Sequence, residues 1–142
     1  MKNLILLALM TSLFSLTSLA AKKSEVNRCL DNAQSNMAMK QCVYEEYSRQ
    51  DQKLNAEYQE LMVKLKKDAS DDGKEIIDRV IKAERAWIAL RDTSCAVEGI
   101  DMLGGSGEGL IVGGCLGKLT RERVVWVMGL QKSLGQADAG TQ

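Results

Sequence analysis

The sequence predicts an all-α fold, a small disulfide-stabilised helical domain of three main helices plus one short N-terminal helix. Apolar side chains recur every three or four residues along most of the chain, which is typical of amphipathic helices, and no segment alternates like a strand. The chain has no Pro, a residue that interrupts helices. It has four Cys, which we expect to form two disulfides because the protein is predicted to be exported.

The N-terminal segment has the features of a secretory signal peptide. Lys2 precedes an apolar run that extends from Leu4 to Leu19, and the small residues Ser18 and Ala20 occupy the positions that a signal peptidase reads. Cleavage after Ala20 would send the protein to the periplasm or the medium, without a membrane span. The predicted organisation is a signal peptide at 1–20, a single helical domain at 21–135 and a flexible tail at 136–142.

The short helix is expected over residues 25–33. Ser35 or Asn36 is a plausible N-cap for a longer second helix, because both side chains can accept a hydrogen bond from the first turn. This helix should run to about Lys67 and end in the polar stretch 68–73. Apolar residues mark one face of it: Leu54, Tyr58, Leu61, Met62 and Leu65.

A third helix is expected from near Lys74, with Asp71 or Asp72 as its cap. We interpret Trp87 as a core anchor, and Arg91 follows one turn later, so its guanidinium can stack on the indole. The inner face of this helix is predicted to consist of Ile76, Ile77, Val80, Ala83, Trp87, Leu90 and Ser94.

Glycine is concentrated in the segment from Gly99 to Gly114, where it supplies seven of sixteen residues. Such a run loses much conformational entropy when it is ordered, so it predicts a loop that interrupts the helices. A last helical pattern begins near Leu116. The alternative is that the glycines let two helices pack closely around a tight connection.

Composition excludes several classes of function. The chain has 19 basic and 19 acidic residues, whereas a nucleic-acid-binding protein needs a concentrated basic face. It has no His, which removes the usual general base and the commonest metal ligand. The sequence Gly117-Lys118 is not a phosphate-binding loop, because Val112 and Leu119 stand where that motif needs Gly and Ser or Thr. We therefore expect no enzyme activity, no metal and no cofactor.

Four cysteines permit three pairings. Cys29 and Cys42 lie on either side of the first predicted turn, and Cys95 and Cys115 lie on either side of the glycine-rich segment. Each of these pairs would join the two helices of one hairpin without demanding other tertiary contacts. We expect the pairings 29–42 and 95–115, each contributing about 3 kcal/mol in the chain-entropy model.

The string Ala-x-x-x-Trp-x-x-x-Arg-Asp-x-x-Cys occupies residues 83–95 and is followed by Gly-Gly-Ser and then Cys. Together with several shorter motifs in the same order, it resembles the lysozyme inhibitor LprI-like family of small secreted bacterial proteins. The resemblance implies a helical protein of the periplasm or cell envelope, with lysozyme inhibition in at least one branch of the family. The matching pieces are Cys29, Cys42, 51–58, 83–95, 104–106, 115–116 and 119–123.

An inhibitor of an enzyme with a cleft needs a narrow, protruding loop that is held at its base. We expect the glycine-rich loop to act in this way, with Ser106 hydrogen-bonded to a catalytic carboxylate of a muramidase and Glu108 meeting its basic surface. A disulfide at the base would lower the ordering cost of binding. The predicted loop residues are Gly104, Gly105, Ser106, Gly107, Glu108 and Gly109.

A charged cluster is predicted at the base of the same hairpin, formed by Arg91, Asp92, Arg121 and Arg123. These side chains can bind a partner or pair with one another, and we favour internal pairing that fixes the hairpin. The alternative function is a non-enzymatic envelope protein that uses its apolar helix faces for interaction. The near-zero net charge favours this alternative, since an inhibitor of strongly basic lysozymes would usually be acidic.

Overall fold

The computed structural model describes residues 23–67 and 70–139, with the backbone alone described from 135 onward. Within these residues the fold is all-α, as predicted, and no strand is present. The predicted signal peptide at 1–20 lies outside the described residues. The elements are α1 (Glu25–Asn32), α2 (Asn36–Leu65), α3 (Asp71–Glu98), the 3-10 helix η1 (Ile100–Met102) and α4 (Glu108–Ala139).

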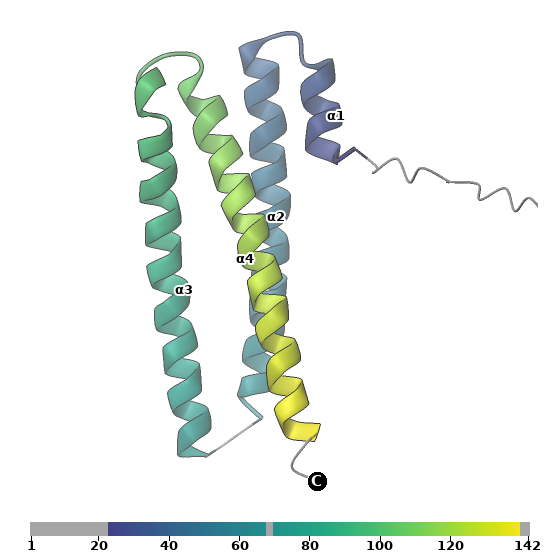
Figure 1. The fold of residues 1–142 in the computed structure, drawn as a ribbon, viewed down its shortest axis with the longest axis vertical. Helices are drawn as coiled ribbons and strands as arrows, with labels where there is room; N and C mark the ends of the chain where they lie inside the picture. The colour runs from purple at the N-terminus through teal and green to yellow at the C-terminus, as the bar shows by residue number, and fades with distance from the viewer. Residues whose placement is uncertain (1–22, 68–69, 140–142) are drawn as a thin grey trace, which may run out of the picture.

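The three long helices lie side by side along the long axis of the molecule (Figure 1). The chain descends α2, returns along α3 and descends again along α4, while the short α1 packs against the first turns of α2. Helix α4 packs most extensively on α2, and α3 packs mainly on α4. The α1–α2 turn and the α3–α4 connection therefore lie at the same end of the molecule.

Serine side chains cap the first three helices. The hydroxyl of Ser35 accepts a hydrogen bond from Ala38 N at 3.2 Å, which confirms one of the two predicted caps of α2. Ser24 caps α1 in the same way. The prediction for α3 was wrong, because Ser70 is its cap and Asp71 is already its first residue. The neutral hydroxyl of serine is sufficient to accept a hydrogen bond from a backbone N–H of the first turn, so a charged cap such as Asp is not required.

The apolar core occupies the half of the molecule away from the α3–α4 connection. The face predicted for α2 supplies Leu54, Leu61 and Leu65, and α4 supplies Val124 and Val127. Trp87 packs against this cluster, as predicted, but is only partly buried. The prediction that Leu90 lies on the inner face of α3 was wrong, because its side chain is 64% exposed. The other partly buried side chains around the core are Met62, Ile76, Ile77, Val80, Leu130 and Leu134.

The glycine-rich segment is not one long loop, which corrects the prediction for residues 99–114. Helix α4 begins at Glu108, so only residues 99–107 connect the helices. Gly109, Gly113 and Gly117 recur every four residues along α4 and face α2. A Cβ on Gly113 would lie 2.8 Å from the ring of Tyr44 and from Val43 Cγ2. These glycines allow α2 and α4 to approach closely, and we call them the glycine seam.

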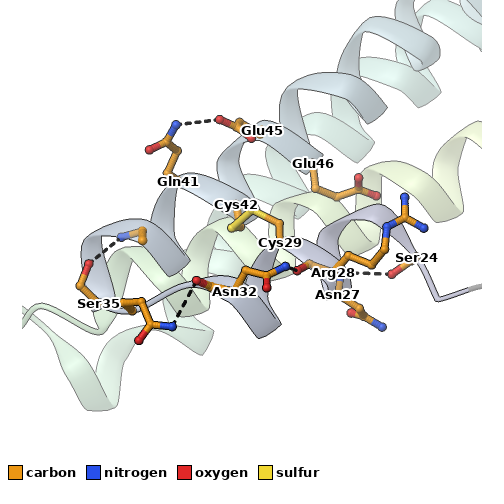
Figure 2. The surroundings of a disulfide bond; sticks show 12 residues. Ser24, Asn27, Arg28, Cys29, Asn32, Ser35, Gln41, Cys42, Glu45 and Glu46 are labelled. Carbon is orange, nitrogen blue, oxygen red and sulfur yellow. Dashed lines mark hydrogen bonds between the residues drawn. A yellow bond between two sulfur atoms is a disulfide. The ribbon is translucent and has the colours of Figure 1, made fainter.

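Both predicted disulfides are present. The bond between Cys29 and Cys42 joins α1 to α2, with a Cα–Cα distance of 5.7 Å (Figure 2). The bond between Cys95 and Cys115 joins the end of α3 to α4, with a Cα–Cα distance of 5.4 Å. Both distances lie in the usual range for unstrained bridges. The two disulfides hold the end of the molecule that the apolar core does not reach.

The C-terminal part of the chain continues α4 further than expected. The predicted tail at 136–142 begins inside this helix, which extends to Ala139, and residues 140–142 lie outside the described part. Within the residues that the structure describes, no helix is long and apolar enough to cross a membrane.

Candidate functional site

The connection between α3 and α4, residues 99–107, forms the tip of the longest helical hairpin (Figure 1). It contains η1 and then a turn at Gly104, whose φ of 73° lies in the left-handed region that favours glycine. The Cys95–Cys115 disulfide closes its base. We call residues 99–107 the tip.

Two side-chain hydrogen bonds fix the tip. Asn36 Nδ2 at the start of α2 donates to Ser106 Oγ at 3.0 Å. The backbone N–H of Gly104 donates to Glu108 Oε2 at 2.8 Å. Together with backbone bonds such as Gly105 N to Met102 O at 2.8 Å, they give the tip a defined conformation. The tip is therefore preorganised by the protein itself.

These bonds change the interpretation of the predicted loop residues. Ser106 lies in the tip and Glu108 directly after it, and each uses an oxygen to hold the tip in shape. Glu108 and Gly109 belong to the first turn of α4 rather than to a loop. The large side chains that the tip presents to solvent are apolar: Ile100 (60% exposed), Met102 (50%) and Leu103 (74%).

Below the tip, a belt of ion pairs joins the three long helices. Arg91 is buried, only 6% exposed, and its guanidinium contacts Asp92 at 2.8 Å and Asp51 at 3.6 Å. Its Nη1 donates to Thr120 Oγ1 at 3.3 Å. We call the whole set the ion-pair belt, and its charged members are Glu46, Asp51, Glu84, Arg91, Asp92, Arg121 and Arg123.

Two guanidinium groups lie close to the ring of Trp87. Arg91 Cζ is 5.1 Å from the Trp87 ring centroid, which confirms the predicted stacking, and Arg123 Cζ is 5.2 Å away. Arg123 also lies 3.9 Å from the Trp126 ring centroid and pairs with Glu84 at 2.9 Å. Cation–π contacts of this kind contribute about 0.5–2 kcal/mol each. Arg91 pairs with Asp92 within the predicted cluster, whereas Arg123 pairs with Glu84 and Arg121 with Glu46, two acids that the prediction did not include.

Glu46 is the acid that joins α2 to α4 within the belt. Its carboxylate accepts hydrogen bonds from Arg49 at 2.7 Å and Gln50 at 3.0 Å, and Arg121 lies 3.3 Å away. Burial raises the pKa of Glu46, but these hydrogen bonds and the charges of Arg49 and Arg121 outweigh it and hold the pKa below its usual value. Glu46 is therefore ionised in the folded protein at neutral pH.

Tyr47, on α2, lies beside the ion-pair belt. Its ring lies 5.3 Å from Arg91 Cζ. Burial raises the pKa of Tyr47, and the charges of Asp51 and Asp92 raise it further against the opposing charge of Arg91. The hydroxyl is therefore neutral over the physiological range.

Reasoning from the sequence missed the partners of the arginines. Glu46, Glu84 and Thr120 are buried on helix faces that the apolar pattern alone marks as core. The available signal was their register: each falls in phase with apolar neighbours, as Glu84 does with Val80 and Trp87. A charged residue in phase with a core stripe predicts a buried partner of opposite charge.

These features define a class: a small all-α protein in which disulfides hold a preorganised, protruding hairpin. The comparisons with known proteins identify the family. Residues 28–126 match the family model described as lysozyme inhibitor LprI, and the chain belongs to that family. It is also 33% identical over 109 residues to uncharacterized protein R02472 of Rhizobium meliloti (strain 1021), covering 71% of this chain and 77% of that protein. No solved structure matches the chain.

Proposed function

We propose that this protein is exported by its N-terminal signal peptide and inhibits muramidases of the lysozyme type outside the cytoplasm. It acts by steric blockade, inserting the tip into the substrate cleft of the enzyme without chemistry of its own. The family to which it belongs is described by lysozyme inhibition. Its two disulfides suit an oxidising compartment.

The observation that carries this proposal is the construction of the tip. A disulfide at its base and hydrogen bonds from Asn36 and Gly104 order it before any partner arrives. Preorganisation lowers the entropic cost of binding. Exposed Ile100 and Leu103 offer apolar surface, and exposed apolar patches on small proteins commonly mark interaction sites.

The roles assigned to the residues differ from those expected from the sequence. We assign the contact with the enzyme to Ile100, Met102 and Leu103, and we assign Ser106 and Glu108 to holding the tip in shape. Replacing Ser106 and Glu108 with Ala should therefore weaken inhibition by loosening the tip. The loss should be smaller at low temperature, where a loosened tip is better ordered.

The test is a lysis assay with the oxidised mature protein and several muramidases. Wild type should protect cells from lysis, and the double variant Ile100→Ser/Leu103→Ser should protect them at least about tenfold less well, since buried aliphatic contacts contribute about 1–3 kcal/mol each. The matched control is Val125→Ser, which removes a side chain of α4 that is 66% exposed and should leave protection unchanged.

Failure of wild type to inhibit any muramidase would show that the proposed function is wrong. The second candidate, an envelope interaction protein, would then be favoured. It is supported by the exposed apolar residues outside the tip, which include Val63 on α2 and Trp126 on α4.

A further inference from the structure

We propose that Cys29 is a modification site, at which a small thiol opens the Cys29–Cys42 disulfide and remains attached as a mixed disulfide. A thiol that also carries an amino group is favoured. The Cys95–Cys115 disulfide stays closed under the same conditions. The proposal concerns the reactivity of the oxidised protein and does not depend on muramidase inhibition, so either can fail without the other. It is carried by the unequal surroundings of the two disulfides and by the weak attachment of α1.

The two disulfides differ in exposure. Cys29 is half-buried, whereas Cys42 is only 4% exposed. In the other bond, Cys95 is 0% exposed and Cys115 is 5% exposed. Thiol–disulfide exchange requires direct attack on a sulfur atom, so its rate depends on access. Cys29 is therefore the cysteine that a thiol reaches most easily in the folded protein.

An open cavity borders the accessible bond. Its volume is about 290 Å³, and both Cys29 and Cys42 line it together with residues of α1 and α2 such as Asn32 and Gln41. This volume is at the lower end of the range for small-molecule sites, about 300–1,000 Å³. The cavity therefore suits a small thiol compound.

Glu45 gives the cavity a negative charge. It is the only ionisable side chain among the residues that line the cavity. Gln41 Nε2 donates to Glu45 Oε1 at 2.8 Å, which holds the carboxylate beside the disulfide (Figure 2). Because like charges repel, Glu45 slows the approach of a thiolate that carries further negative charge. An aminothiol balances its thiolate with an ammonium group and avoids this repulsion.

The reaction is one thiol–disulfide exchange. The thiolate of the small compound attacks Cys29 Sγ, forming a new S–S bond there as the bond to Cys42 Sγ breaks. The electron pair of the broken bond leaves with Cys42 Sγ, which takes a proton from solvent. One S–S bond replaces another, so the step needs no external oxidant or reductant.

The mixed disulfide persists because α1 is weakly attached without the bond. No residue of α1 is buried, and among the described elements this helix contacts α2 alone. The ion pair between Glu25 and Arg49, at 3.6 Å, is accessible to solvent and contributes little. An isolated helix of this length is marginal in water. Opening the bond therefore lets α1 unfold, which moves Cys29 away from Cys42 and slows reclosure.

The first experiment treats the oxidised mature protein with cysteamine at neutral pH, quenches samples with acid and locates the modified cysteines by mass spectrometry. Early in the reaction, cysteamine should be found on Cys29 at least about tenfold more often than on Cys42. The Cys29–Cys42 bond should open at least about a hundredfold faster than Cys95–Cys115, which becomes accessible only when the protein opens further. Equal modification of Cys29 and Cys42, or equal opening of the two disulfides, would overturn the proposal.

A second experiment tests the role of Glu45. Glu45→Gln should speed the reaction with 2-mercaptoethanesulfonate, whose thiolate form carries two negative charges, about twofold or more at low salt. The reaction with cysteamine should change less than about twofold, because its thiolate form has no net charge. Glu60→Gln removes an exposed carboxylate farther along α2 and is the matched control. If Glu45→Gln affected both thiols equally, the preference for an aminothiol would be wrong.

A third experiment follows α1 by amide hydrogen exchange. After modification with cysteamine, exchange in residues 25–32 should accelerate at least about tenfold, while exchange near Leu61 and Val127 should change about threefold or less. Cys29→Ser/Cys42→Ser, which lacks the bond, should show the same pattern without any thiol. If α1 stayed protected in that variant, other contacts would hold it in place, and the persistence of the mixed disulfide would be contradicted.

Discussion

A buried guanidinium group is stable only where its charge and its N–H donors have partners. Arg91 meets this requirement through three helices at once, with Asp92 on its own helix, Asp51 on α2 and Thr120 on α4. The rings of Tyr47 and Trp87 lie beside the plane of its guanidinium. The planar guanidinium therefore contributes through stacking as well as through its charge.

Replacing Arg91 with Lys should lower the free energy of unfolding by about 2–4 kcal/mol, because Lys keeps the charge but cannot stack and hydrogen-bond in the same geometry. Chemical denaturation measures the change. Arg85→Lys on the exposed side of α3 is the control and should change stability by about 0.5 kcal/mol or less. Equal effects of the two substitutions would show that Arg91 contributes charge alone.

Glu46 predicts a dependence of stability on pH. Its pKa is lower in the folded protein than in the unfolded chain, so its contribution to stability is fully present above the unfolded-state value of about 4.3. That contribution is lost as the pH falls through the folded-state pKa. In melting curves between pH 7 and pH 3, the stability difference between wild type and Glu46→Gln should shrink as the pH falls. A difference that stays constant across this range would contradict the prediction.

At the scale of an element, α4 contains adjacent glycines with opposite roles. Gly113 faces α2, where a Cβ would lie 2.8 Å from Tyr44, whereas Gly114 is exposed and a Cβ there would meet nothing within 4 Å. Gly113→Ala should destabilise the protein by about 1–3 kcal/mol through overpacking. Gly114→Ala should stabilise it by about 0.5–1 kcal/mol, because alanine favours the helix.

Thermal melts of the two variants measure this contrast. Both substitutions improve intrinsic helix propensity equally, so any difference between them reports the close approach of α2 and α4. If both variants were stabilised, the glycine seam would have no role in packing. If both were destabilised, the helical conformation of this part of α4 would be in doubt.

The glycines of α4 show which features of the fold could be predicted from the sequence and which could not. Periodicity and capping residues predicted α2 correctly, because apolar burial and satisfied amides are local requirements that Leu54, Leu61 and Ser35 meet. The glycine run was misread because the cost of glycine in a helix is local, whereas the benefit of close packing against Tyr44 depends on another helix. A spacing of four residues between Gly109, Gly113 and Gly117 was the signal.

The candidate site was predicted only in part for a similar reason. The position of the tip and the Cys95–Cys115 bond follow from spacing along the chain, and both are present. The engagement of Ser106 depends on Asn36, which is 70 residues away in sequence. No local sequence pattern shows that the Ser106 hydroxyl already accepts a hydrogen bond within the protein, so this side chain was expected to bind the partner enzyme instead.

At the scale of the molecule, the two ends are stabilised by different means. The end away from the tip contains the apolar core around Leu61 and Val127. The end with the tip buries mainly cysteines, Val43 and glycines, and it depends on two disulfides and the ion-pair belt. The inhibitory surface we propose therefore belongs to the end that lacks a large apolar core.

This division predicts a graded response to loss of the tip disulfide. In Cys95→Ser/Cys115→Ser, amide hydrogen exchange should accelerate most in residues 95–115, because the chain there loses a cross-link contributing about 3 kcal/mol and has few apolar contacts to replace it. Exchange near Leu61 and Val127 should accelerate less, since those amides open only with the core. Under the proposed function, the same variant should inhibit muramidases less well at temperatures where it remains folded. A uniform acceleration along all three long helices would contradict the prediction, because it would show that the tip and the core open as one unit.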